Sequence, residues 1–228
     1  MLLFNALTGM SENAAGTAEE VKKLLHSKYG QSFRVTHIGD RFNTGTTTLF
    51  CQPDDGSELS FTVVYKPLEN TISDDLTVRK AAFSFDRELS EKLLGKGLAS
   101  ASITIFGEAD GSAAGGWTSP AEFAGASGTK YLFSNIALKG SSLTQQQLDD
   151  LLGVLADTDK ECGGISFVSS VFLIPEEEYE ACSKKLTAMP RITGNEIAKF
   201  SPAAKLGVTA EKGSAKITAG DISAAVKG

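Results

Sequence analysis

The chain has 228 residues, of which 41% are apolar, 22 are basic and 28 are acidic. This composition predicts a soluble globular protein of one or two domains. It excludes a collagenous or disordered chain, and no apolar run reaches the ~18 residues of a membrane span. The net charge of −6 is evenly spread: residues 1–110 carry 11 basic and 15 acidic side chains, and residues 111–228 carry 11 and 13. We therefore expect neither nucleic acid nor an anionic membrane as a partner.

Three cysteines, Cys51, Cys162 and Cys182, cannot all pair with one another. A strand expected at 165–174 would span roughly 33 Å, which keeps Cys162 too far from Cys182 for a disulfide. The N-terminus has no basic start and only a short apolar stretch, unlike a secretory leader. These features predict three free thiols and a cytoplasmic location. The alternative is that a leader preceded Met1 and was removed.

The first half predicts a helix, a meander, a second helix and a strand. Thr17 and Glu20 form a capping-box pattern ahead of a helix at about 18–29. Alternating runs at 33–38, 46–52 and 59–66, separated by turn residues, predict an antiparallel meander. A helix over 75–96 should pack on that meander through a stripe made of Val78, Ala82, Phe85, Leu89 and Leu93. A strand is expected at 101–106.

The segment 108–129 is rich in glycine and has no regular period, so we expect a long loop or a boundary between two halves. Beyond it, the pattern predicts a strand at 130–138, a helix from about 143, a buried strand at 165–174 and a helix that starts near Pro175. Alternation over 206–217 predicts a C-terminal hairpin. The fold class is thus α+β, with halves at 1–107 and 130–228 that form two domains or one.

Trp117 and Phe123 are the candidate binding residues, because both lie in the glycine-rich segment. Ordering glycine-rich backbone costs conformational entropy, and burying one aromatic side chain regains only part of it. We therefore expect a mobile loop with Trp117 partly exposed, available as an anchor for a partner protein. The alternative is that both rings pack against the protein's own core.

Catalytic patterns are weak in this sequence. His37 and Asp40 could form a general base pair, which favours a hydrolase with a cleft between the halves as the alternative function. Residues 39–48 fail the phosphate-loop pattern, since no lysine follows the second glycine. The spacing of Asp157, Asp159 and Glu161 is that of a calcium-binding loop. However, other residues occupy the positions where such a loop has its glycine and its final glutamate. We expect no metal and no cofactor.

The expected order of elements over roughly 17–160 resembles that of small acidic secretion chaperones, which bind an unfolded partner over a sheet and helix surface. The glycine-rich segment and the C-terminal residues depart from that pattern. The resemblance implies that such a layout can bind without catalysis. Our leading hypothesis is a non-catalytic protein-interaction protein, an accessory, immunity or chaperone-like factor that engages another protein through an exposed sheet or loop surface.

Overall fold

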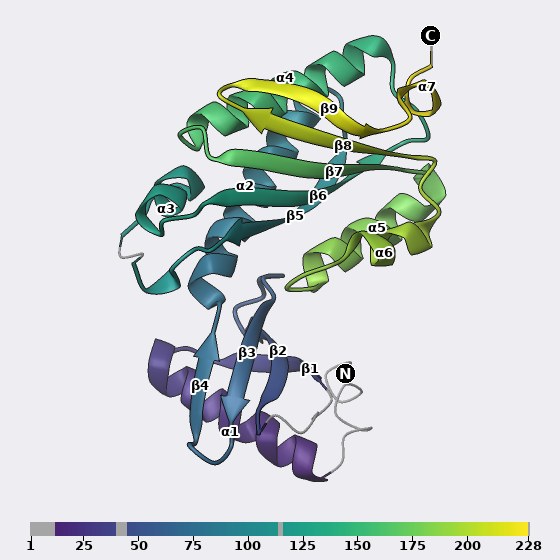
Figure 1. Cartoon of the computed structure of the whole chain (residues 1–228). Coiled ribbons are helices and arrows are strands. Elements are labelled where there is room, and N and C mark those ends of the chain that lie inside the picture. The colour runs from purple at the N-terminus through teal and green to yellow at the C-terminus, as the bar shows by residue number, and fades with distance from the viewer. Residues whose placement is uncertain (1–11, 40–44, 114–115, 228) are drawn as a thin grey trace. The chain divides into compact units, whose positions relative to one another are not determined.

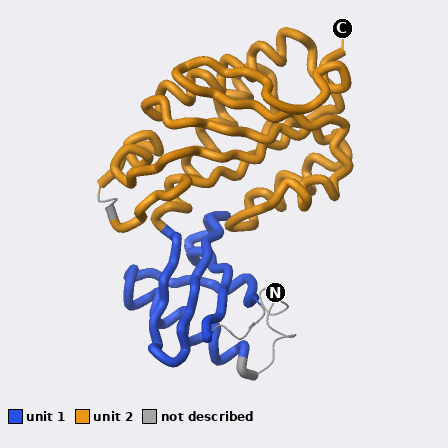
Figure 2. Tube along the Cα trace, in the orientation of Figure 1, with its two compact units in different colours: residues 1–76 blue, residues 77–228 orange. Residues whose placement is uncertain are grey.

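The computed structural model describes residues 12–39, 45–113 and 116–227 and has an α+β fold (Figure 1). The chain divides into two compact units, residues 1–76 and residues 77–228, which Figure 2 distinguishes by colour. Each unit has its own sheet and its own apolar core, and each is described by itself below. Within the described residues, no helix is both long and apolar enough to cross a membrane.

Unit 1 is a helix followed by a four-stranded meander. Helix α1 (Glu12–Tyr29) precedes strands β1 (Phe33–Ile38), β2 (Thr47–Pro53), β3 (Phe61–Lys66) and β4 (Thr71–Asp74). The sheet has the order β1-β2-β3-β4 and every pairing is antiparallel, which confirms the predicted meander. Alternate residues of the strands point into a core that α1 covers, and Phe33 meets Phe61 edge to face.

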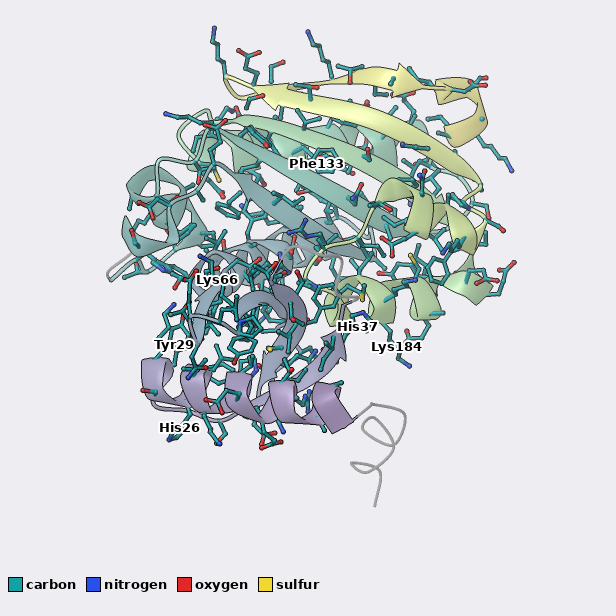
Figure 3. The ribbon with its side chains drawn as sticks, turned by 60° about the horizontal axis from the view of Figure 1, so that its bottom comes forward. His26, Tyr29, His37, Lys66, Phe133 and Lys184 are labelled. Atoms are coloured by element: carbon teal, nitrogen blue, oxygen red, sulfur yellow. The ribbon has the colours of Figure 1, made fainter. Side chains whose placement is uncertain are left out.

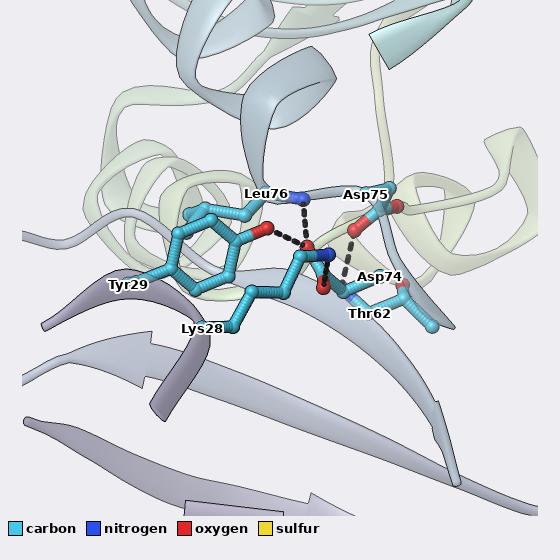
Figure 4. A network of polar contacts seen from close by, with 6 residues as sticks. All are labelled: Lys28, Tyr29, Thr62, Asp74, Asp75 and Leu76. Carbon is cyan, nitrogen blue, oxygen red and sulfur yellow. Dashed lines mark hydrogen bonds and ion pairs between the residues drawn. The ribbon is translucent and has the colours of Figure 1, made fainter. Parts of the chain in front are cut away.

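The C-terminal end of α1 is tied to the end of β4 through one buried carboxylate (Figure 4). Asp74, whose side chain is only 1% exposed, accepts hydrogen bonds from Tyr29 at 2.6 Å and from the backbone of Leu76 at 3.1 Å. Lys28 adds an ion pair at 2.8 Å. Since the carboxylate has three partners, it satisfies the rule that buried charges are paired, and it fixes where β4 stops.

Unit 2 is built on a mixed five-stranded sheet with the order β5-β6-β7-β8-β9, in which only β6 and β7 run parallel. The strands are β5 (Ser100–Gly107), β6 (Tyr131–Lys139), β7 (Ser166–Ile174), β8 (Ala204–Glu211) and β9 (Ser214–Gly220). The helices are α2 (Leu76–Leu94), α3 (Pro120–Ala126), α4 (Gln145–Glu161), α5 (Glu176–Ala188), α6 (Gly194–Ile197) and α7 (Ile222–Ala225), with short 3₁₀ turns η1 (Gly111–Ala113) and η2 (Ala198–Phe200). The predicted C-terminal hairpin is confirmed as β8 and β9.

Helices cover the two faces of this sheet unequally (Figure 1). On one face, α2, α3 and α4 enclose a large core that includes Phe85, Leu132 and Phe167. On the other face, α5 and the α6 segment cover a smaller core around Ala101, Phe172 and Leu186. Because β6 and β7 are parallel, the sheet is expected to be covered by helices on both faces around these strands. The second face, however, is covered over only part of its length.

Several expectations are corrected by the structure. Helix α1 begins at Glu12, ahead of the predicted start at 18, so Thr17 lies inside the helix. Phe85 of α2 contacts Phe106 of β5 and Phe167 of β7, so α2 packs on the five-stranded sheet and not on the meander as predicted. The helix that covers the meander is α1. The boundary between the units accordingly falls at residues 76–77, ahead of α2, and not within the glycine-rich segment.

Candidate functional site

The described part of the glycine-rich segment forms regular structure. It contains η1 and helix α3, whose first turn is capped by Ser119 and begins with Pro120. Phe123 of α3 is completely buried, with its ring 5.5 Å from that of Phe106, so its expected role as a partner anchor is wrong. Trp117 is half-buried and packs edge to face on Phe123 at 5.7 Å. The burial of Phe123 in the core offsets the entropy cost of ordering this segment.

The second predicted pair does not gather into a site. His37 is exposed, because a β-bulge between Val35 and His37 shifts the register of β1 against β2. The bulge turns the imidazole away from the face that Phe33 shares with Val35, and the ring instead lies tilted beside that of Phe50, with 5.3 Å between the ring centroids. Asp40 lies outside the described residues. The hydrolase alternative stays a prediction with nothing in the described geometry to favour it.

The acidic residues considered for a calcium site and the three cysteines have structural contacts instead. Asp159 is buried in α4 and accepts the backbone N–H of Gly213 at 2.7 Å, while Asp157 and Glu161 form ion pairs with lysines. Within the described ranges, no group of three or more His, Cys, Asp or Glu side chains is placed to hold a metal ion. Burial raises the pKa of the Cys51 thiol to about 12 and that of Cys162 and Cys182 to about 11, which keeps all three protonated at neutral pH.

A feature that sequence reasoning did not locate is the uncovered part of the second sheet face, here called the open face. Its apolar side chains come from three neighbouring strands: Ile105 of β5, Tyr131 and Phe133 of β6, and Val168 of β7. Ile105 lies opposite Phe133, and Phe133 lies opposite Val168, so the three form one row across the sheet. Figure 3 labels Phe133 on this face. Exposure reaches 44% for Ile105, 43% for Tyr131 and 36% for Val168.

The ring of Tyr131 packs over the neighbouring strand β5. It lies opposite Gly107 of β5, where any Cβ would collide with the tyrosine ring. An aromatic ring that lies over a cross-strand glycine is a recognised way to fix both strands. The ring is therefore positioned by the sheet while 43% of the residue stays exposed, which makes it a rigid part of the surface.

At one end the open face continues into a groove of about 400 Å³ between the sheet and the α6 segment. Phe133 and Phe172 form its apolar lining, and Asn135, Ser170 and Lys205 contribute polar groups from the strands. Asn135 is buried and donates a hydrogen bond to the carbonyl oxygen of Ile192 at 3.0 Å, which ties the α6 segment to the sheet. The groove and the open face thus form one continuous surface that shares Phe133.

The edge of the sheet next to the open face is closed. The backbone N–H of Thr104 on edge strand β5 donates to Asp86 of α2 at 3.2 Å, and the backbone carbonyl of Thr104 accepts from Arg79 at 3.1 Å. Both charged side chains are only 7% exposed. Because these groups occupy the hydrogen bonds that an added strand would use, α2 blocks pairing of another chain with this part of β5. The available surface is the face and not this edge.

Comparison with known proteins informs the fold. No protein-family model matches the sequence, and no curated protein is significantly similar to it in sequence. Among solved structures, the chain is similar to the crystal structure of a DUF5037 family protein from Ruminococcus gnavus, with a TM-score of 0.64 over 88% of this chain and 94% of that chain. The two sequences are 12% identical. The similarity supports the α+β architecture described above, and the fold is what the two chains share.

Proposed function

We propose that the protein is a non-catalytic interaction protein that binds a segment of another protein on the open face of the five-stranded sheet. The observation that carries this proposal is the row of apolar side chains from three adjacent strands, in which Ile105 and Val168 are exposed and Phe133 between them is half-buried. Single exposed apolar residues are common on proteins, but neighbouring ones that form a patch mark interaction sites.

The construction of the surface favours binding over catalysis. The apolar side chains stand on strands that are packed from behind by α2 and α4, so they need little reorganisation to meet a partner. Tyrosine and phenylalanine contribute large contact areas at low entropy cost, which is the property of interface hot spots. Because Asp86 and Arg79 close the β5 edge at Thr104, the partner is expected to lie across the face.

The experiment is partner recovery from cells of the source organism with tagged variants. Val168→Asp and Ile105→Asp each place a charge within the open face. Leu68→Asp is the matched control, since Leu68 is 97% exposed in the turn after β3 and lies outside the open face. All three sites are exposed, so the variants should keep the fold, which circular dichroism would check. We expect the same partner with the wild type and Leu68→Asp, and its loss with both face variants. Equal recovery with all four proteins would refute the proposal.

A further inference from the structure

The groove beside the open face contains a positive charge that no described acidic side chain neutralises. Its lining consists of Phe133, Asn135, Ser170, Phe172, Thr193, Gly194, Asn195, Ala198, Pro202 and Lys205. Lys205 is the single charged residue of that lining. Its Nζ atom lies 5.1 Å from the centre of the Phe172 ring, and no carboxylate of the described residues lies within ion-pair distance of it.

The acidic residue closest to this lining in the sequence is already engaged. Glu196 accepts hydrogen bonds from the backbone N–H of Thr193 at 2.9 Å and from its hydroxyl at 3.1 Å, completing the capping box of α6. These bonds lower the pKa of Glu196, as does the charge of Lys199. Because its carboxylate is bound within its own turn, the charge of Lys205 remains available to a ligand.

The surroundings of Lys205 favour a carboxylate as that ligand. Lys205 is exposed, and its Nζ atom lies over the Phe172 ring, so the ammonium group stands at the groove and can attract a carboxylate that enters it. The protein as a whole carries a net charge of −6. This net negative charge repels a partner that carries many acidic residues. A single carboxylate that pairs with Lys205 instead fixes the position and the orientation of the partner on the surface.

Resting on the function proposed above, we infer that the partner segment carries an acidic side chain, Asp or Glu, that enters the groove and pairs with Lys205 while its apolar residues lie on the open face. The geometry sets the spacing. Phe133 pairs with Val168 of β7 and Lys205 pairs with Phe172 of β7, so the two residues lie two strand spacings apart and four residues apart along the strands. Those steps amount to about 10 Å across the sheet and about 13 Å along it, which an extended chain covers in about five residues. The flexible lysine side chain shortens this distance.

The test uses a random 12-residue peptide library displayed on phage and selected against the full chain. Three baits are compared: the wild type, Lys205→Glu, and Lys80→Glu as a control for the same charge change at an exposed position of α2. With the wild type and the control we expect peptides that combine apolar residues with an Asp or Glu within about five positions of them. With Lys205→Glu, we expect the acidic residue to be lost or replaced by Lys or Arg.

Fluorescence polarisation with a selected peptide then gives the size of the effect. Replacing its acidic residue by the corresponding amide should weaken binding to the wild type by about 2- to 5-fold at low salt, as for a partly exposed ion pair, and should have no effect on binding to Lys205→Gln. Unchanged binding of the amide peptide to the wild type would overturn the inference.

Three further outcomes show which of the two claims fails, the inference or the proposed function. Apolar peptides that need Val168 but show neither acidic enrichment nor a response to Lys205→Glu would overturn the role of Lys205 and leave the open face as the binding surface. Peptides whose binding survives Val168→Asp would contradict the proposed function itself. A selected peptide that requires its free C-terminal carboxylate and no acidic side chain would overturn the inference of a side-chain ligand.

Discussion

Removing the Asp86 carboxylate should destabilise unit 2 strongly. The carboxylate accepts hydrogen bonds from the hydroxyl groups of Ser102 at 3.0 Å and Thr104 at 2.6 Å and from the backbone N–H of Thr104 at 3.2 Å. In Asp86→Ala these buried donors lose their acceptor, and Arg79 loses a nearby opposite charge. Leaving a buried hydrogen-bond donor without its acceptor costs about 1 to 3 kcal/mol, and more where the lost acceptor is charged, so we expect a loss of about 3 to 5 kcal/mol in the free energy of unfolding.

The assay is urea denaturation followed by the fluorescence of Trp117, the single tryptophan, which lies in the same unit as Asp86. Glu91→Ala is the matched control, since Glu91 is an exposed carboxylate on the same helix whose ion pair with Arg87 should contribute less than about 1 kcal/mol. A loss below about 1 kcal/mol for Asp86→Ala would refute the reasoning.

The same carboxyl group makes stability depend on pH. Burial raises the pKa of Asp86 above its ordinary value of 3.8, although Arg79 and the hydroxyl donors oppose the increase. The folded protein therefore binds this proton more tightly than the unfolded chain does. The contribution of this group to the free energy of unfolding should fall as the pH rises from about 3.8 through the folded pKa. Asp86→Ala should lack that component of the pH profile.

Three further outcomes follow from the packing. Phe85→Ala should cost about 3 to 5 kcal/mol in denaturant titration, as large-to-small changes in an aromatic core do, whereas a cost below about 1 kcal/mol would place Phe85 outside the core. In the native protein at pH 8 the three cysteines should react slowly with a thiol reagent, since burial raises each thiol pKa to about 11 or 12. All three should react after denaturation, and fast labelling of the native protein would contradict their burial. Trp117 should show emission intermediate between buried and exposed indole, and Phe123→Ala should shift it to the red; an unchanged spectrum would contradict the contact between the two rings.

The sequence predicts most elements but not how they assemble. Alternation and turn residues locate β1, β2, β3 and the C-terminal hairpin, because a half-buried strand needs period-two alternation. The stripe of α2 identifies which side of the helix is apolar. It cannot identify which of two sheets that side covers, since both present similar aliphatic and aromatic faces.

Local signals for some missed features were present. Ser119, Pro120 and Glu122 form an N-terminal capping pattern that predicts α3, but the surrounding glycines concealed it. The four residues of β4 are too few to show a period. The bulge that turns His37 outward has no local sequence signature.

The candidate site could not be located from the sequence because exposure of the open face depends on where a distant helix ends. Ile105 and Val168 lie in strands whose alternate residues are buried, and apolar side chains in such strands are normally assigned to a core. The helices α5 and α6 cover the part of this face around Ala101 and Phe172 and leave Ile105 and Val168 exposed. That placement is a tertiary property of the fold.

The most direct measurement of the central claim is site-specific photo-crosslinking in cells of the source organism. Tyr131→p-benzoylphenylalanine places a photoreactive ring within the open face at a position that is 43% exposed and already aromatic. Leu68→p-benzoylphenylalanine places the same group at the control position in unit 1. We predict a discrete adduct with one partner protein from position 131 and none from position 68, and its loss when Val168→Asp is added. An adduct that forms equally from position 68, or none from position 131 while the partner is still bound, would contradict the claim that the partner lies on the open face.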